Sequence, residues 1–258
     1  AGYGYHAAAI AGYYEVVGWP DLPPDGPYLA YTDTISPRFI TPALLAAIDR
    51  RRQTGTGCVI EAAQLECGLQ LMAPEVLDFQ INNCKATRRG NRDLAMGPQG
   101  VYPVQGDDRW IAITVQSDEN WLSLQMLMGA PQWAADKRFE TTSGRIDGHD
   151  LLDRGISEWT AELDGRDLET KLLAEGVPAG LVARSSDLFA DAQYQHLGFY
   201  RWHDHPAMGR VPYAGHQYSI EGYDHGPRAA SPLLGEHTFE VLTDFLDFDA
   251  DAIARLTI

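Results

Sequence analysis

A long helix with one carboxylate near its start constrains the fold of this chain more than any other feature. An apolar stretch from Tyr28 leads to Asp33, which comes just before Ser36-Pro37, a pair typical of a helix beginning. Apolar residues then repeat at helical spacing at positions 44, 45 and 48. The Thr-Gly-Thr-Gly run at 54–57 predicts the end of the helix, because glycine favours the left-handed conformation that follows a last turn.

The position of Asp33 suits a carboxylate that acts as a nucleophile. Amide groups in the first turn of a helix carry partial positive charge, which keeps a carboxylate ionised at neutral pH even where it is partly desolvated. The alternative interpretation, which the local sequence alone favours, is an ordinary aspartate that caps the helix. The segments that surround Asp33 in the sequence reverse this preference.

Further segments follow the Asp33 helix in a definite order. They are Glu61-Ala-Ala, Arg88-Arg-Gly-Asn91-Arg, Gly100-Val-Tyr102-Pro103, Gly106-Asp-Asp-Arg-Trp110, Ser117-Asp-Glu-Asn-Trp121, Lys137-Arg-Phe139, Gly176-Val-Pro178-Ala-Gly180 and Leu234-Gly-Glu236-His237. Together with the Asp33 block, this series resembles the family III CoA-transferases, the carnitine dehydratase/bile-acid-inducible group. Formyl-CoA transferases and α-methylacyl-CoA racemases belong to the same superfamily, and the resemblance runs from the first residues to the last.

The resemblance implies an α/β fold with part of a Rossmann-like large domain and a smaller α+β domain. Residues 1–88 would form the C-terminal part of the large domain, 89–190 the small domain, and 191–258 a return segment. In this family two protomers interlock, so we expect a homodimer. The chain begins at Ala1 rather than at methionine. We therefore expect a C-terminal portion, or a component of an assembly in which another chain or segment supplies the N-terminal half.

The resemblance also implies the chemistry, which is transfer of coenzyme A between carboxylic acids. Asp33 would attack an acyl-CoA and carry coenzyme A as an aspartyl-CoA thioester before passing it to an acceptor acid. A carboxylate nucleophile needs no deprotonation, so the lack of a partner base near Asp33 does not count against this role. Coenzyme A would be a substrate, and we expect no permanently bound cofactor and no metal.

The segment at residues 90–100 matches the position of the glycine-rich active-site loop of the family. Gly97 is one of few glycines here, so a highly mobile lid is not expected. Arg89 and Arg92 have side chains that suit a substrate carboxylate or a coenzyme A phosphate. A solvated linker is an equally good interpretation of this segment.

Tyr3 distinguishes two reaction classes within the superfamily. The resemblance places Tyr3 where the racemases have a histidine that transfers a proton. Tyrosine has an ordinary pKa of about 10 and is a poor base at neutral pH, although its hydroxyl can donate to a carbonyl or carboxylate. Coenzyme A transfer is therefore favoured over racemisation. His6 lies three residues further on and is the residue that could supply the base for racemisation instead of Tyr3. Tyr31 and its aromatic neighbours hint at a bulky acyl group, and a non-catalytic subunit is the remaining alternative.

Composition excludes several partners. The formal charge of −16 disfavours nucleic acid and anionic membranes, because neither would meet a basic surface. Three cysteines without metal-type spacing predict reduced thiols in a cytoplasmic protein. The histidines at 203, 205, 216 and 225 lie in loop-like sequence without matching carboxylate or cysteine spacing, so metal binding is not expected.

The remaining elements follow from hydrophobic spacing. A hairpin is predicted around residues 105–108, with helices at 7–17, 65–72, 121–128, 148–162 and 166–175 and a last helix that begins near 236–238. Strands are predicted at 59–60 and 177–182, and long polar connections at 72–93 and 191–232. Four tryptophans are expected in the core of the small domain, namely Trp110, Trp121, Trp133 and Trp159.

Overall fold

The computed structural model describes residues 2–224 and 226–256. The chain divides into two compact units, Ala1–Val182 and Ala183–Ile258. The first unit holds two separate groups of buried apolar side chains, one among its N-terminal helices and one around a small sheet. The domain boundaries expected after residues 88 and 190 stay predictions.

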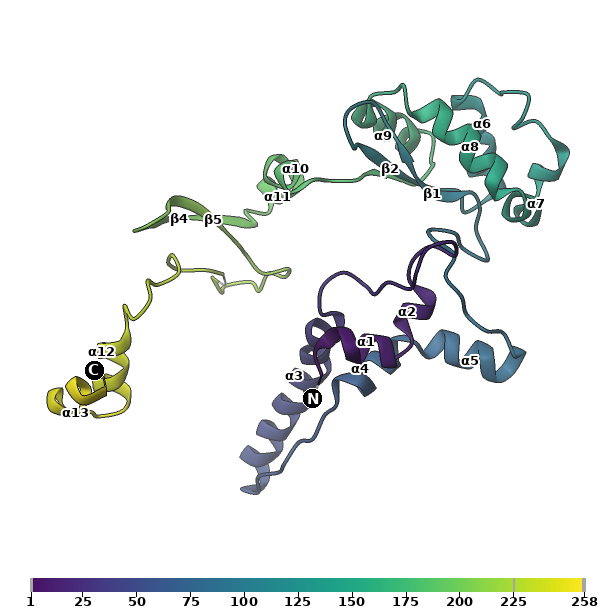
Figure 1. Ribbon diagram of the computed structural model, residues 1–258. Helices are drawn as coiled ribbons and strands as arrows, with labels where there is room; N and C mark the ends of the chain where they lie inside the picture. The colour runs from purple at the N-terminus through teal and green to yellow at the C-terminus, as the bar shows by residue number, and fades with distance from the viewer. Residues whose placement is uncertain (1, 225, 257–258) are drawn as a thin grey trace. The chain divides into compact units, whose positions relative to one another are not determined.

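Five helices form the N-terminal part of the first unit (Figure 1). They are α1 (Gly4–Ile10), α2 (Tyr13–Val16), α3 (Tyr31–Thr54), α4 (Gln64–Leu71) and α5 (Ala73–Asn82). The single helix predicted for 7–17 is interrupted, because Gly12 takes a left-handed conformation with φ 95° between α1 and α2. Helix α1 contacts both α3 and α4, and small side chains such as Ala8 and Ala11 allow this close packing.

Helix α3 begins five residues earlier than Ser36-Pro37 predicted. It starts at Tyr31 and includes both Pro37 and Pro42. Proline usually disfavours a helix interior because it lacks an amide hydrogen and crowds the preceding turn. Here one face of the first turns is buried in the contact with α1 and α4, at Thr32, Ile35 and Ser36. Tertiary packing therefore outweighs the local preference. The predicted end is confirmed, because Gly55 takes the left-handed conformation with φ 73°.

Two predictions for the following segment are wrong. Residues 55–63 belong to no strand, and Val59 is exposed without a neighbouring strand to pair with. The predicted connection at 72–93 instead contains α5. Pro74 lies in the first turn of this helix, and Asn83 ends it in the left-handed conformation with φ 52°. Proline near a helix start and asparagine just after its end are both favourable, so local sequence supports the helix that was missed.

A three-stranded antiparallel sheet organises the rest of the first unit. Its strands β1 (Gln99–Pro103), β2 (Trp110–Thr114) and β3 (Ala179–Leu181) lie in the order β1-β2-β3. Ala112 pairs with Val101 on one side and with Gly180 on the other. The predicted hairpin and the predicted strand at 177–182 are therefore confirmed. Helices gather around this sheet (Figure 1), namely α6 (Asp118–Leu127), the short 3-10 helix η1 (Lys137–Glu140), α7 (Thr142–Asp147), α8 (His149–Thr160) and α9 (Gly165–Ala174).

The core of this part is one continuous cluster of buried apolar side chains. Fully buried side chains come from β2, α6, α8 and α9, including Ile111, Leu124, Leu152 and Leu172. Three of the four predicted core tryptophans lie in or against it: Trp121 is buried, and Trp133 and Trp159 pack on its edge. Trp110 is the exception. It is 38% exposed, pairs with Pro103 at the turn end of the hairpin, and its indole nitrogen donates to Asp108 at 2.7 Å.

The second unit contains more regular structure than its polar sequence predicted. Its elements are α10 (Ser185–Ala190), α11 (Ala192–His196), the hairpin strands β4 (Tyr200–His205) and β5 (Gly209–Ala214), α12 (Thr238–Glu240), the π-helical turn η2 (Val241–Phe245) and α13 (Ala250–Leu256). The connection predicted for 191–232 is wrong over α11, β4 and β5. Gly209 takes a left-handed conformation and the His205 ring accepts from the amides of Ala207 and Met208, which closes the hairpin.

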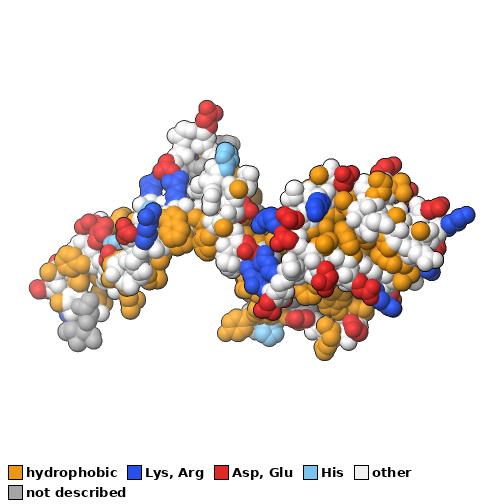
Figure 2. Space-filling model, turned by 90° about the horizontal axis from the view of Figure 1, so that it is seen from above, with side chains coloured by type: hydrophobic (Ala, Val, Ile, Leu, Met, Phe, Trp, Pro, Cys, Tyr) orange, Lys and Arg blue, Asp and Glu red, His pale blue; other side chains and the backbone are white. Residues whose placement is uncertain are grey.

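On the face that Figure 2 shows, acidic side chains are scattered rather than gathered into one patch. Among the described residues, no helix has the length and apolar character needed to span a membrane. The three cysteines, Cys58, Cys67 and Cys84, are unpaired thiols, and only Cys67 is buried.

Candidate active site

Asp33 lies in the first turn of α3 and its side chain is exposed. The residue before it, Thr32, is completely buried, and Ile35 and Ser36 further along the same face are also buried. The buried face fixes the orientation of α3 about its axis: Thr32 lies in the contact with α1, and Asp33 lies on the solvent-exposed side. First-turn amides give this end of the helix partial positive charge, a favourable setting for a carboxylate.

The start of α1 lies directly against the Asp33 carboxylate. A Cβ atom built on Gly4 would lie 2.8 Å from Asp33 Cγ and 2.9 Å from Oδ1. Such distances are too short for non-bonded atoms, so the side chain of Asp33 occupies the space that any residue other than glycine would need. Thr32 joins the same two helices, because its hydroxyl donates to the carbonyl of Gly4 at 3.0 Å. Two segments separated in sequence thus meet at the carboxylate.

The two tyrosines predicted for the site lie at the two helix starts. Tyr3 is the residue before α1 and is 78% exposed. Its backbone amide donates to His6 Nδ1 at 3.1 Å. His6 therefore helps to cap α1. Tyr31 begins α3 and is half-buried, with its ring edge-on to Tyr13 at 5.1 Å. Tyr3 follows directly onto Gly4, so the structure brings Tyr3, Gly4 and Asp33 to one region.

The basic loop that contains Arg88 and Arg89 is anchored to residues of its own unit. Arg88 donates to the carbonyls of Tyr14 and Trp19, each at 3.3 Å. Arg89, which was a predicted ligand, is half-buried, and its positive charge acts on Asp78 of α5. The amide of Gly90 donates to Gly18 at 2.8 Å, which holds this part of the loop against the segment after α2.

Arg92 is engaged with acidic side chains of α8. Its guanidinium contacts Asp150 and donates to Asp153 at 3.0 Å. Asp153 also accepts from the hydroxyl of buried Tyr102 at 3.0 Å. The nearest ring nitrogen of His149 is 3.7 Å from Asp153, too long for a hydrogen bond, so that contact is electrostatic.

These contacts set the ionisation of the group. Burial raises the pKa of Asp153, but His149, Arg92 and Tyr102 outweigh it and leave this pKa below its usual range. Burial, followed by the negative charge of Asp153, raises the pKa of the Tyr102 hydroxyl. Tyr102 therefore stays protonated and donates a hydrogen bond to the ionised carboxylate of Asp153. Arg92, Asp153 and Tyr102 pair with one another and hold the loop to β1 and α8, whereas neither buried ring nitrogen of His149 has a hydrogen-bond partner among the residues that the structure describes.

Gly97 is buried at the end of the loop. Its carbonyl accepts from Arg145 Nε at 2.7 Å, and a side chain here would meet Ile146 and His149. The guanidinium of Arg145 is itself completely buried and also reaches Phe139, Asp118 and Thr142. The partners of Arg92 and Gly97 thus belong to α7 and α8, whereas the neighbours of Asp33 come from α1. Sequence reasoning missed Gly4, whose signal was the Gly-Tyr-Gly start of the chain.

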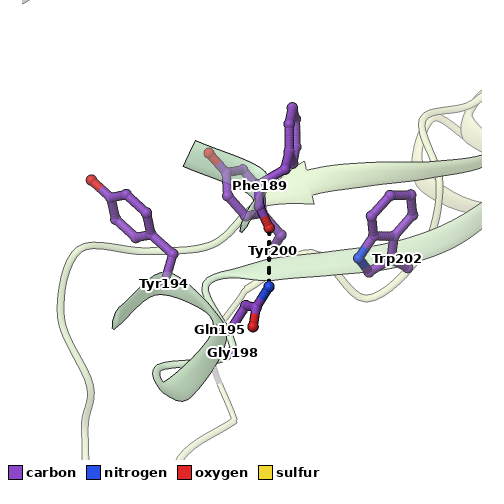
Figure 3. A pocket seen from close by; sticks show the side chains of 6 residues that line it. All are labelled: Phe189, Tyr194, Gln195, Gly198, Tyr200 and Trp202. Carbon is purple, nitrogen blue, oxygen red and sulfur yellow. Dashed lines mark hydrogen bonds between the residues drawn. The ribbon is translucent and has the colours of Figure 1, made fainter. Parts of the chain in front are cut away.

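A separate cavity lies in the second unit (Figure 3). It has a volume of about 340 Å³ and is lined by Phe189, Tyr194, Gln195, Gly198, Tyr200 and Trp202. The amide nitrogen of Gln195 reaches the carbonyl of Phe189 at 3.4 Å, which spans one side of the cavity. The rings of Phe189 and Tyr200 lie 4.6 Å apart. The cavity is mainly the gap inside an aromatic cluster that joins α10 and α11 to β4.

The histidines of the second unit have structural contacts. His203 Nε2 lies 3.0 Å from the carbonyl of Pro227, and His216 stacks on Tyr218 at 5.3 Å. His225, the last of the four histidines considered for a metal site, lies outside the described residues. Within residues 2–224 and 226–256, no three His, Cys, Asp or Glu side chains are close enough together to hold a metal ion.

Comparison with known proteins assigns the family. The model of the family described as CoA-transferase family III matches residues 1–238, so the chain belongs to this family. The succinyl-CoA–D-citramalate CoA-transferase of Chloroflexus aurantiacus is 28% identical over 257 residues, which cover 99% of this chain and 63% of that protein. The succinyl-CoA:glutarate CoA-transferase of Mus musculus is 25% identical over 260 residues, covering 99% of this chain and 58% of the relative.

A solved structure supports the same assignment. A CaiB/BaiF family protein from Brucella suis superposes with a TM-score of 0.82 at 27% identity, covering 95% of this chain and 63% of that one. The expected α/β family III fold is therefore confirmed. The chain spans about 60% of the length of these relatives.

Proposed function

We propose that the chain carries the nucleophile of an acyl-CoA:carboxylate CoA-transferase, and that this nucleophile is Asp33. The observation that carries the proposal is the exposed Asp33 carboxylate in the first turn of α3, within the stretch matched by the family model. An ionised carboxylate can attack a thioester without a base. The relatives' names support the reaction class, because those named above transfer coenzyme A from succinyl-CoA to D-citramalate or glutarate.

The reaction is a sequence of acyl exchanges that needs no net proton transfer. An oxygen of Asp33 bonds to the acyl carbon while the C–S bond breaks, giving a mixed anhydride and the coenzyme A thiolate. The thiolate attacks the aspartyl carbonyl, the donor acid leaves as a carboxylate, and an Asp33–CoA thioester remains. An acceptor carboxylate displaces the thiolate to form a second anhydride. Attack of the thiolate on the acceptor acyl carbon then releases the new acyl-CoA and restores Asp33.

The protein's task is to hold these intermediates and exclude water, because each step exchanges groups of similar energy. Tyr3 and Tyr31 are proposed to line the acyl site beside Asp33. Arg89, Arg92 and Gly97 stay candidates for contact with coenzyme A or acid. For Arg92 such contact would require exchange of its bonds to Asp150 and Asp153, since these occupy the guanidinium.

A trapping experiment tests the nucleophile. The protein at its full natural length is incubated with succinyl-CoA and then with hydroxylamine or borohydride, and peptides are analysed by mass spectrometry. The modification is expected on Asp33, and Asp33→Ala should lose transfer activity. Asp49→Ala is the matched control, because Asp49 is an exposed aspartate on the same helix. Full activity in Asp33→Ala would exclude the proposal. A panel of dicarboxylic and aromatic acids then defines the acceptor.

Racemisation of an acyl-CoA is the second candidate, and the structure gives an observation against it. The base would have to come from Tyr3 or His6, and His6 Nδ1 already accepts from the backbone in the cap of α1. Exchange of the α-hydrogen of a 2-methylacyl-CoA for deuterium in heavy water would favour this alternative. Its absence alongside active transfer favours the transferase.

Association and location are further parts of the proposal. An interlocked homodimer is expected from the family, and a cytoplasmic location from the three unpaired cysteines. Coenzyme A phosphates are proposed to be bound mainly by segments beyond this chain. In support, Arg38 is the basic residue nearest to Asp33 in sequence, and it donates to the carbonyl of Thr34. Sedimentation of the protein at full natural length at submicromolar concentration tests the dimer. Calorimetry with the 258-residue chain tests whether the coenzyme A phosphates are bound mainly by other segments. Micromolar binding of coenzyme A to this chain alone would contradict that proposal.

A further inference from the structure

Gly4 is a glycine for which the backbone gives no reason. It is the first residue of α1, and its conformation lies outside the left-handed region that favours glycine. Alanine is preferred to glycine by about 1 kcal/mol inside a helix. The local sequence would therefore gain from a side chain at this position. The reason for glycine must come from a neighbour.

The neighbour is the candidate nucleophile. An added Cβ would lie 2.8 Å from Asp33 Cγ, 2.9 Å from its Oδ1 and 2.8 Å from Ala30 Cβ. Non-bonded carbon atoms have their optimal separation at about 3.5–4.0 Å. One side chain methyl would thus force the carboxylate to move by roughly 1 Å, the difference between these distances. Of the two carboxylate oxygens, Oδ1 is the one nearer to Gly4.

The start of α1 has little freedom to move away instead. Its Gly4 carbonyl accepts from the buried hydroxyl of Thr32 at 3.0 Å. Thr32 is completely buried and lies against α4, where its Cγ2 is 3.3 Å from the position of a Cβ on Gly68. The helices α1, α3 and α4 therefore meet around Thr32, one residue before Asp33. Strain introduced at Gly4 should be relieved by the exposed carboxylate rather than by this junction.

We propose that Gly4 is a positioning residue for Asp33: its bare Cα supports one face of the carboxylate and leaves the other face to the acyl group. The inference rests on the function proposed above for Asp33. A misplacement of about 1 Å can lower a rate by roughly 10²-fold when reacting groups are held for attack. Gly4→Ala should therefore slow formation of the aspartyl intermediate while the helix itself is stabilised.

The test compares two glycines of the same junction. Gly68→Ala adds a methyl that meets Thr32, Ala11 and Tyr13 at 3.3–3.5 Å but does not meet the carboxylate. Both variants are made in the protein at full natural length, and the rate of Asp33–CoA formation from succinyl-CoA is measured in a single turnover by intact mass. Gly4→Ala is expected to lower this rate and kcat by about 10²-fold, with KM for succinyl-CoA changed less than about threefold.

Gly68→Ala is expected to change thermal stability more than the rate. A rate for Gly4→Ala within twofold of the wild type would overturn the inference, and so would equal losses in the two variants, since these would indicate a general packing effect. Asp33→Ala separates this inference from the proposed function. If Asp33→Ala is inactive and Gly4→Ala is normal, only the positioning role fails. If Asp33→Ala is active, the proposed function itself fails.

A second variant covers the case in which Gly4→Ala does not fold. In Gly4→Ala/Ala30→Gly the clash with Ala30 is removed, while the clash with Asp33 remains. This variant should fold and still form the intermediate about 10²-fold more slowly than Ala30→Gly alone. Equal rates in these two variants would refute the positioning role.

Discussion

Replacement of Arg145 by methionine should destabilise the first unit far more than replacement of an exposed arginine. The Arg145 side chain has no solvent exposure, and its guanidinium donates to the carbonyls of Gly97 and Phe139 at 2.7 and 3.0 Å. It also donates to Asp118 at 2.7 Å and to Thr142. Methionine fills a similar volume but offers no donor, so the packing is largely kept while the hydrogen bonds are lost.

The magnitude follows from which partners water can reach. The two backbone carbonyls belong to buried residues, and a buried acceptor left without a donor costs about 1–3 kcal/mol. Asp118 is 61% exposed, so water replaces most of its lost interaction. The expected loss is therefore about 2–6 kcal/mol, which lowers the melting temperature of a unit of this size by about 5–20 °C.

Thermal unfolding followed by tryptophan fluorescence measures this loss, because Trp121 lies in the adjacent core. Arg166→Met is the matched control. Arg166 is 64% exposed and pairs with Glu169 one turn along α9, so its loss should cost less than about 1 kcal/mol. Similar melting temperatures for the two variants would refute the reasoning, because they would mean that the buried hydrogen bonds of Arg145 add nothing to stability.

Three further predictions concern the same unit. The pKa of Asp153 is lowered in the folded protein, so its ionised carboxylate adds stability above the unfolded pKa of about 3.9, and this stability is lost as pH falls through the lower folded pKa. Asp153→Asn should therefore flatten the acid side of a plot of stability against pH. An unchanged plot would contradict this. Gly144→Ala should cost about 3 kcal/mol, because a Cβ would lie 1.7 Å from the Arg138 carbonyl oxygen, whereas Gly180→Ala meets nothing within 4 Å and should stay within about 0.5 kcal/mol in urea unfolding. Tyr13→Phe removes the hydroxyl that donates to Gly68 at 2.9 Å and should lower the urea stability by about 1 kcal/mol, and no change would show that the bond is replaced by water.

The elements that sequence predicted well are those whose signals are local. The β1–β2 hairpin has apolar strands on either side of a Gly-Asp-Asp turn, and Gly106 takes φ 117° as such a turn requires. Helix α8 places its apolar side chains at a steady helical spacing, with Leu152 and Ile156 fully buried. In both elements the conformation that the local sequence favours is also the one that buries the apolar side chains, so the local sequence alone predicts the element.

The errors arose where tertiary contacts override local preference. Pro37 predicts a helix start, but α3 extends back to Tyr31, where Thr32 is buried against α1 and α4 and Ile35 is also buried. The strands β4 and β5 carry polar and charged residues among their aromatic ones, because much of this hairpin is exposed, and so they resembled a connection. The backbone hydrogen bonds between β4 and β5 stabilise these strands, although their sequence has no clear alternation of apolar and polar residues.

The candidate site was predicted in part for the same reason. Asp33 stood out through its segment, and Tyr3 and Tyr31 were found near it. Gly4 was missed because the close approach of α1 and α3 is a contact between segments about thirty residues apart, which spacing along one helix cannot indicate. The sequence does not indicate the ion pairs of Arg92, because their partners Asp150 and Asp153 lie 58 and 61 residues further on.

Buried Thr32 and exposed Asp33 are consecutive, so the direction of the carboxylate depends on the rotational phase of α3. One inserted residue turns everything beyond it by about 100° around a helix axis, because a turn contains 3.6 residues. An alanine inserted between Thr32 and Ser36 would therefore turn these two buried side chains onto different faces of the helix. The same insertion near Asp49, on the exposed last turns, would leave the anchors and the carboxylate unchanged. Insertion scanning along α3 should thus show an abrupt boundary between intolerant and tolerant positions.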